Sequence, residues 1–333
     1  MKKVNLADLA WGEWSSPGGK FHGRSKELSI ALGAVRNATL AQGGHPFDLE
    51  YGRLSPGKTG CPYHRHSSQW ELFLIVAGHG TVRHRGGHQP VKAGDAILQP
   101  PGAAHQLINT SDGDLDYLLI ADNPLVDLWH YPDSNKMGYR PGGGSFRPDF
   151  VDYWLDEDPA APTSAEPKAG FPWADTRFVD TATLPWDLRA SPRGKYASHC
   201  RDISLALGGQ RDVGVQGGGH PFDLQTRRVP AGAAICPLHA HTVQWECFIV
   251  VAGRATVRTP TGRFPIGPGD VVLQPPGTAH QVINDSPDEF VCHIVADNPA
   301  ADIFHYPDSG KWGIKPQRKF FRLNETDYFE GEE

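Results

Sequence analysis

Two short stretches of this chain place metal-binding side chains at the same spacing. HRHSSQWE at 64–71 has two histidines two positions apart and a glutamate five positions after the second, and HAHTVQWE at 239–246 repeats the pattern. Alternate residues of a β-strand point to the same side, so each histidine pair is expected to face one interior. The candidate ligands are His64, His66 and Glu71 in the first stretch and His239, His241 and Glu246 in the second.

A third histidine completes each set. His105 follows a Pro-Pro-Gly bend at 100–102, which is expected to direct its side chain inward, and His280 follows the same bend at 275–277. Three neutral imidazole nitrogens and one carboxylate oxygen suit a divalent transition metal: Fe, Mn, Ni, Co, Cu or Zn. On an octahedral ion, four protein ligands leave two positions for water, substrate or oxygen. We therefore expect two metal ions per chain, one for each set.

These elements belong to a repeat that covers nearly the whole chain. His64 and His239 are 175 positions apart, and the same offset maps GGHPFDL, LQPPG, ADNP and HYPDS of the first half onto identical segments of the second. Self-similarity at a fixed offset indicates a tandem duplication. We predict a first domain over 1–157, an Ala- and Pro-rich linker over 158–175, and a second domain over 176–333.

The repeat also separates the proposed ligands from the other histidines. Ten of the sixteen histidines recur as five pairs at this offset, and the six proposed histidine ligands are among them. His79, His84 and His88 do not recur, so we interpret their cluster as a solvated hairpin. The alternative for the shared set is an ordinary polar lining, but four recurring ligand types at fixed spacing favour a metal site.

Short apolar runs between Gly, Pro and Asp predict the elements that hold these residues. The runs LFLIV at 72–76, DAIL at 95–98 and DYLLIA at 116–121 have the spacing of strands in a barrel or sandwich. Helical periodicity is weak, so helices should be few, short and peripheral. The predicted fold class is all-β, with two tandem antiparallel β-barrels in one chain.

Composition excludes several function classes. The chain has 333 residues, 39% hydrophobic and 21% charged, with a formal net charge of −6. The absence of a basic surplus argues against nucleic acid as a partner, and no apolar run reaches the ~18 residues of a membrane span. Five cysteines do not suggest a disulfide framework, and the N-terminal stretch lacks the apolar core of a signal peptide. We therefore expect a cytoplasmic protein with a small-molecule substrate.

The motifs resemble those of the cupin superfamily. Its first motif, G-x5-H-x-H-x3,4-E-x6-G, is matched up to Gly78 and again up to Gly253, apart from the position of the leading glycine. Its second, G-x5-P-x-G-x2-H-x3-N, is matched over 94–109 and 269–284. The resemblance implies a two-domain cupin, with a metal inside one end of each jelly-roll barrel.

The same resemblance narrows the activity without fixing it. The four-ligand set is similar to that of quercetin dioxygenase-type and oxalate decarboxylase-type cupins, which implies a metal-dependent dioxygenase or decarboxylase acting on a small oxygen-bearing substrate. Gentisate-type dioxygenases use three histidines without the glutamate and match less well. A sugar or sugar-phosphate isomerase or epimerase, and a non-catalytic small-molecule binding protein, stay open as alternatives. Assembly as a homo-oligomer is compatible with every one of these.

Four further shared residues are candidates for catalysis. Gln69 and Gln244 have the strand parity of the glutamate ligands, so each is expected to bond a substrate or a metal-bound water. His45 and His220, in GGHPFDL, are candidate proton carriers, although a turn histidine that caps backbone groups is an equally good interpretation.

Overall fold

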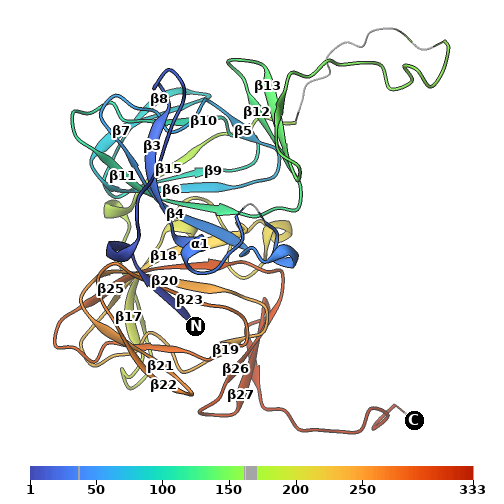
Figure 1. Ribbon diagram of the computed structural model, residues 1–333. Helices are drawn as coiled ribbons and strands as arrows, with labels where there is room; N and C mark the ends of the chain where they lie inside the picture. The colour runs from blue at the N-terminus through green and yellow to red at the C-terminus, as the bar shows by residue number, and fades with distance from the viewer. Residues whose placement is uncertain (37, 161, 163–170, 333) are drawn as a thin grey trace. The chain divides into compact units, whose positions relative to one another are not determined.

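The chain forms two compact units that are both built from β-strands. The computed structural model describes residues 1–36, 38–160, 162 and 171–332 (Figure 1). The first unit comprises Ala10–Ala182, and the second comprises Met1–Leu9 together with Thr183–Glu333. Half of the predicted linker, 161 and 163–170, lies outside the described residues.

The strands of the first unit form three antiparallel sheets within the described residues, in the orders β15-β9-β6-β11-β4-β3-β2, β10-β7-β8 and β14-β13-β12-β5. The bounds are β2 (Gly12–Ser15), β3 (His22–Glu27), β4 (Phe47–Leu54), β5 (Arg65–His66), β6 (Glu71–Ala77), β7 (His79–His84), β8 (Gly87–Lys92), β9 (Asp95–Gln99), β10 (His105–Ile108), β11 (Leu115–Asp122), β12 (Asp127–Tyr131), β13 (Lys136–Arg140), β14 (Ser145–Phe146) and β15 (Arg177–Asp180).

The second unit repeats this arrangement in the sheets β1-β23-β20-β25-β18-β17-β16, β22-β21-β24 and β19-β26-β27-β28. The bounds are β1 (Lys2–Asn5), β16 (Asp187–Ala190), β17 (Ala197–Asp202), β18 (Phe222–Val229), β19 (Ala240–His241), β20 (Glu246–Ala252), β21 (Ala255–Thr259), β22 (Gly262–Ile266), β23 (Asp270–Gln274), β24 (Gln281–Ile283), β25 (Phe290–Asp297), β26 (Asp302–Tyr306), β27 (Lys311–Lys315) and β28 (Lys319–Phe321).

The predicted fold class is confirmed. The three apolar runs lie in β6, β9 and β11, and the antiparallel sheets are compatible with a jelly roll. The α-helices of the described residues, α1 (Leu28–Ala31) and α2 (Ile203–Ala206), are single turns. No helix in the described part of the chain has the length and apolar character needed to cross a membrane.

Each large sheet is completed by a strand from the start of the other repeat. β1 pairs with β23 along Lys2↔Leu273 to Asn5↔Asp270, and β15 pairs with β9 along Arg177↔Leu98 to Asp180↔Asp95. β1 and β15 are equivalent under the 175-residue offset. The bounds of the compact units therefore differ from the predicted domains 1–157 and 176–333. The repeat places a strand at the start of each copy, but it does not indicate which large sheet that strand joins.

The end of the predicted linker is part of the first unit. Arg65 is buried, and its guanidinium stacks on the rings of Phe171 and Trp173, 4.3 and 3.8 Å from their centroids. It also donates a hydrogen bond to the Phe171 carbonyl at 2.9 Å. Thr176 donates its hydroxyl to Gln99 Oε1 at 2.7 Å. These contacts fix 171–176 beside β5 and β9, so this segment is not a free linker.

The apolar core of each unit lies between its large sheet and its three-stranded sheet. In the first unit the core contains Leu54, Phe73, Ile75, Val82, Val91, Ile97, Leu107, Leu115 and Tyr117. In the second it contains Val229, Phe248, Val250, Val257, Ile266, Val272, Val282, Phe290 and Cys292, among others. Because apolar burial supplies the main stabilising free energy, the strands that carry the candidate ligands are held without help from a ligand.

Deleting Met1–Leu9 tests the exchanged strand. The deletion removes one of the two strands that pair with β23 and leaves β20 in place, so the backbone amides of Asp270–Leu273 that face β1 should exchange with deuterium roughly tenfold faster or more. The equivalent strand β9 keeps its partner β15 and is the internal control. Unchanged exchange in β23, measured by hydrogen–deuterium exchange mass spectrometry, would contradict the pairing.

Candidate metal centres

The first candidate centre begins with a backbone pair. The amide of His64 donates to the His105 carbonyl at 3.1 Å, and the amide of His105 donates to the His64 carbonyl at 2.8 Å. This reciprocal bridge brings together two histidines that are 41 positions apart in the chain. The predicted bend at Pro-Pro-Gly is present, because the Ala103 amide bonds to the Pro100 carbonyl and Gly102 has φ +89°. The imidazole centroids of His64 and His105 lie 4.4 Å apart.

A buried carboxylate fixes the remaining histidine. His66 Nδ1 lies 2.6 Å from Asp127 Oδ2. The other oxygen of Asp127 accepts hydrogen bonds from the amides of Ser67, Ser68 and Gln69 at 2.9–3.3 Å. Asp127 therefore holds both the imidazole and the turn that leads from β5 to β6.

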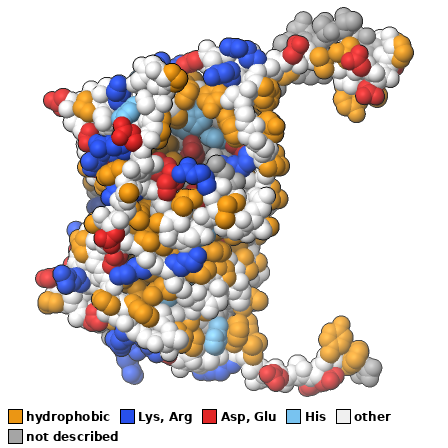
Figure 2. All heavy atoms as spheres, in the orientation of Figure 1, with side chains coloured by type: hydrophobic (Ala, Val, Ile, Leu, Met, Phe, Trp, Pro, Cys, Tyr) orange, Lys and Arg blue, Asp and Glu red, His pale blue; other side chains and the backbone are white. Residues whose placement is uncertain are grey.

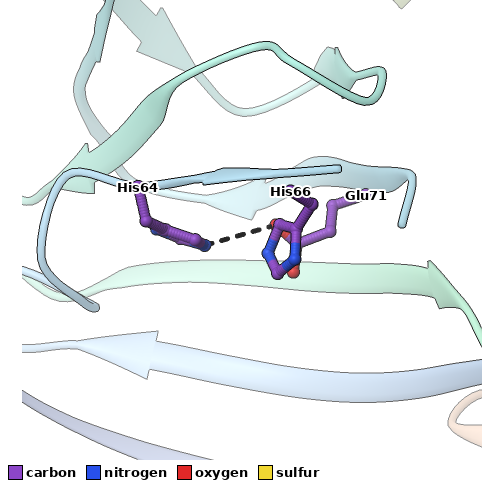
Figure 3. A group of neighbouring side chains, drawn as sticks. All are labelled: His64, His66 and Glu71. Atoms are coloured by element: carbon purple, nitrogen blue, oxygen red, sulfur yellow. Dashed lines mark ion pairs between the residues drawn. The ribbon is translucent and has the colours of Figure 1, made fainter. Parts of the chain in front are cut away.

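Three imidazole nitrogens converge on one glutamate oxygen. Glu71 Oε2 lies 3.8 Å from His64 Nε2, 3.7 Å from His66 Nε2 and 2.8 Å from His105 Nε2. Figure 3 shows His64, His66 and Glu71 pointing toward one another from neighbouring strands. In Figure 2, histidine side chains are visible at the bottom of a hollow in the surface of the first unit. The structure thus brings together all four candidate ligands of the first half.

The second unit contains the same centre. Glu246 Oε2 lies 3.5, 3.7 and 2.9 Å from the Nε2 atoms of His239, His241 and His280. The bridge between His239 and His280 is again reciprocal, with bonds of 3.1 and 2.9 Å. Asp302 Oδ2 lies 2.5 Å from His241 Nδ1 and takes the place of Asp127.

Every imidazole in the two centres presents the same nitrogen to its glutamate. Besides the aspartates, the Nδ1 partners are backbone carbonyls at 2.9–3.0 Å: Pro62, Ala103, Pro237 and Thr278 for His64, His105, His239 and His280, respectively. A neutral imidazole whose Nδ1–H donates leaves the Nε2 lone pair for a metal ion. His66 Nε2 is buried without a hydrogen-bond partner among the described residues. These features fit a divalent transition metal in both units.

The charges at His64 and at the two glutamates agree with that fit. Burial, together with the neighbouring imidazoles, lowers the pKa of His64 to about 3, so this ring is neutral and available as a ligand. Burial alone would raise the pKa of Glu71, but its contacts with His105 and His66 hold that pKa well below its usual range. Glu246 behaves in the same way beside His241 and His239. Both glutamates are therefore ionised at neutral pH and available to a cation.

A cavity opens onto the second centre. It has a volume of about 390 Å³, and its wall includes His239, His241 and Glu246. Beyond the candidate ligands the wall carries both cationic and acidic side chains, with Asp223 among the acids. Burial and the nearby carboxylates of Asp202 and Asp212 raise the pKa of Asp223 to about 7.

The four candidate catalytic residues lie in different places. Gln244 lines the cavity, where its Oε1 accepts from Lys315 Nζ at 2.7 Å and its Nε2 donates to the Asp297 carbonyl at 2.6 Å. Gln69 is buried and donates to the Asp122 carbonyl at 2.7 Å. His45 and His220 are also buried, and His220 is not part of the cavity wall of the second unit.

Sequence reasoning missed Asp127 and Asp302. Both recur at the 175-residue offset, three positions after the ADNP segments, so the repeat contained the signal. It also missed Asp223 and the cations Arg189, Arg227 and Arg318 of the cavity wall. These three cationic positions are not shared between the repeats, so a search restricted to shared residues passes over them.

Comparisons with known proteins agree with this geometry. The model of the cupin domain matches residues 51–121 and 225–296, which include all four members of each ligand set. The oxalate-binding protein of Thermotoga maritima is 32% identical over 68 residues, covering 20% of this chain and 55% of that protein. Auxin-binding protein 1 of Arabidopsis thaliana is 26% identical over 138 residues, covering 39% of this chain and 63% of that protein. The chain thus spans less than two thirds of either relative.

A solved structure extends the likeness to both units. The oxalate decarboxylase of Lactobacillus farciminis, in its formate complex, superposes with a TM-score of 0.53 at 14% identity, over 90% of this chain and 86% of that chain. At this identity the likeness concerns the fold alone. The chain therefore carries two matched cupin domains, one in each repeat and each with the duplicated ligand motif, which is the arrangement of a bicupin.

Proposed function

We propose that this bicupin is a metal-dependent enzyme that acts on a small oxygen-bearing acid, with decarboxylase-type chemistry. The observation that carries the proposal is the cavity of the second unit, which joins the ligand set to a wall of ionisable side chains. The oxalate-binding relative and the decarboxylase of similar fold support an acid as the substrate.

The proposed ligands are the three histidines and one glutamate of each unit. A divalent metal held there acts as a Lewis acid and as a template for an oxygen-bearing group. The chain's own contribution is to orient these side chains before any substrate arrives. The Nδ1 acceptors hold each ring in one orientation, and the burial of the ligands keeps bulk water away from them.

Asp223 is the proposed proton donor in the second unit. Loss of carbon dioxide leaves an electron pair on the neighbouring carbon, and a proton must be added there to complete the product. Asp223 lines the cavity, and its pKa of about 7 leaves much of its carboxyl protonated at neutral pH. Gln244, whose amide is held at both ends, is proposed to orient the acid.

The reaction class is tested by gas exchange. Protein loaded separately with Mn and with Fe is incubated with small mono- and dicarboxylic acids, while carbon dioxide and oxygen are followed together. We expect carbon dioxide release without net oxygen uptake. Oxygen uptake would instead support a dioxygenase, interconversion of aldose and ketose phosphates an isomerase, and binding without turnover a binding protein.

The number of metal ions bound per chain tests the two ligand sets. A saturated chain should hold two ions, because both ligand sets are complete. His64→Ala should remove one ion and leave the second unit loaded, and His239→Ala should do the reverse. Elemental analysis after desalting provides the count. A single ion per chain that is insensitive to one of the two substitutions would show that one centre does not bind metal.

The carboxylates behind the histidines give the next prediction. Asp127→Asn and Asp302→Asn keep the side-chain shape but weaken the bond to Nδ1, so metal affinity should fall roughly 10- to 100-fold in the altered unit. Competition with a chelator measures the affinity of each centre. The unaltered unit serves as the control in each variant, and equal loss from both units would point to general destabilisation.

The pH profile follows from the raised pKa of Asp223. The protonated acid predominates below pH 7, so turnover should fall as the pH rises through about 7. Asp223→Asn should remove this dependence and lower the turnover number by a factor on the order of 100 or more. Asp48→Asn, at the equivalent position of the first unit, is the matched control. An unchanged profile in Asp223→Asn would exclude this residue as the proton donor.

A further inference from the structure

The two units differ at one pair of residues that face each other across neighbouring strands. In the first unit, Gly52 on β4 pairs with Tyr117 on β11. A Cβ at Gly52 would lie 2.1 Å from the Tyr117 ring, so the aromatic ring occupies the space above the glycine. In the second unit the pair is Arg227 and Cys292. The large side chain of the pair is the Tyr117 ring on β11 in the first unit and the Arg227 guanidinium on β18, the equivalent of β4, in the second.

Arg227 has no carboxylate partner among the described residues. Its Nη1 donates to Ser198 Oγ at 3.0 Å and its Nη2 donates to Gln225 Oε1 at 2.9 Å. Its Nε is buried and makes no hydrogen bond in the described structure. Both partners are neutral, so the positive charge is left uncompensated in the wall of the cavity. A guanidinium that is partly withdrawn from water and makes no ion pair gains free energy when an anion joins it.

Two more arginines surround the same part of the wall. Arg189 and Arg211 both line the cavity, and both pair with the single carboxylate of Asp202. The charge of Arg227 contributes to lowering the pKa of Arg189, after burial, which reflects repulsion between the two guanidiniums. We call Arg189, Arg211 and Arg227 the arginine cluster. Two of these cations pair with one carboxylate and the third pairs with none in the described part of the chain, so the cluster favours an anion.

The first unit does not reproduce this cluster. At the positions equivalent to Arg189, Gln225, Arg227 and Arg318, it has Trp14, Glu50, Gly52 and Gly143, respectively. Burial and the nearby carboxylate of Glu27 raise the pKa of Glu50 to about 7. Compared with the second unit, the first unit therefore lacks three cations and has one additional acid at these positions. The metal ligands have therefore been kept in both units while the charge beside them has diverged.

The arginine cluster lies away from the candidate metal ligands. Glu246 and Asp223 both pair with Ala296, so they share one row across the sheet. Arg227 is four positions beyond Asp223 on β18, a backbone separation of about 13 Å. Its Nη2 is directed back toward Gln225, so the guanidinium lies closer to the candidate metal ligands than its backbone does. A ligand that reaches both places must carry two anionic groups separated by carbon atoms.

We propose that the second unit selects a dicarboxylate, with one carboxylate at the metal ligands and the other at the arginine cluster, and that the first unit does not bind it. This inference rests on the proposed function, because it names the substrate class of the same cavity. Arg227 is its specificity-determining residue. The charge difference between the units explains why one copy of a duplicated site takes this ligand.

Calorimetric binding of succinate and butyrate to the metal-loaded chain tests the proposal. The two acids have the same carbon number and differ by one carboxylate. We expect one succinate site per chain, with affinity roughly 10- to 100-fold above that for butyrate. Arg227→Gln should abolish this preference, and Arg227→Lys should retain part of it. Arg228→Gln is the matched control, because Arg228 is more exposed and pairs with Glu289.

A double variant guards against a folding defect. Arg227→Gly with Cys292→Tyr installs the pair that already packs in the first unit, and it should lose the succinate preference while it retains two metal ions. Equal affinities for succinate and butyrate in the parent, two succinate sites per chain, or an unchanged preference in Arg227→Gln would overturn the proposal. Displacement of succinate by equimolar inorganic phosphate would assign the cluster to a phosphoryl group and also overturn it.

The outcomes separate this inference from the proposed function. Succinate binding that depends on Arg227, without carbon dioxide release from any acid, would reject the decarboxylase and keep the dicarboxylate site. Equal turnover of one dicarboxylic acid by the parent and by Arg227→Gln would keep the enzyme and reject the role of the cluster.

Discussion

The bond between Asp127 and His66, with its counterpart between Asp302 and His241, is the interaction on which each centre depends. One carboxylate oxygen holds the imidazole, and the other holds three successive amides of the turn before the glutamate strand. The aspartate is fully buried, so these bonds are made in a medium of low dielectric constant, where they are strong. The position of the glutamate relative to the histidines follows from this single residue.

The duplication has kept the ligand geometry and changed what surrounds it. The distances from the glutamate to the three imidazoles agree within 0.3 Å between the units. Beside them, the first unit has Glu50 and Gly52 where the second has Gln225 and the guanidinium of Arg227. A metal site tolerates little displacement of its ligands, whereas a cavity wall accepts any side chains that fill it. This difference in tolerance accounts for the uneven divergence.

Much of the architecture could be predicted because local patterns determine it. The apolar runs at 72–76, 95–98 and 116–121 define strands without tertiary information, and the parity of His64 and His66 places both on one side. The aspartates were missed because a buried carboxylate far along the chain has no local pattern. The ends of the units were missed because strand partnership is a tertiary property. Arg227 was missed because it is absent from the first repeat.

The exchange of first strands has a consequence for biosynthesis. β1 leaves the ribosome before its partner β23, which is encoded about 270 positions later. At 5–20 residues per second, β1 waits roughly 13–54 seconds before it can pair. β9 likewise waits for β15, so the large sheet of the first unit stays incomplete until synthesis has reached the second repeat. Maturation of the nascent chain is therefore coupled across the duplication: the first unit is completed by a strand of the second repeat, and the second unit by a strand of the first.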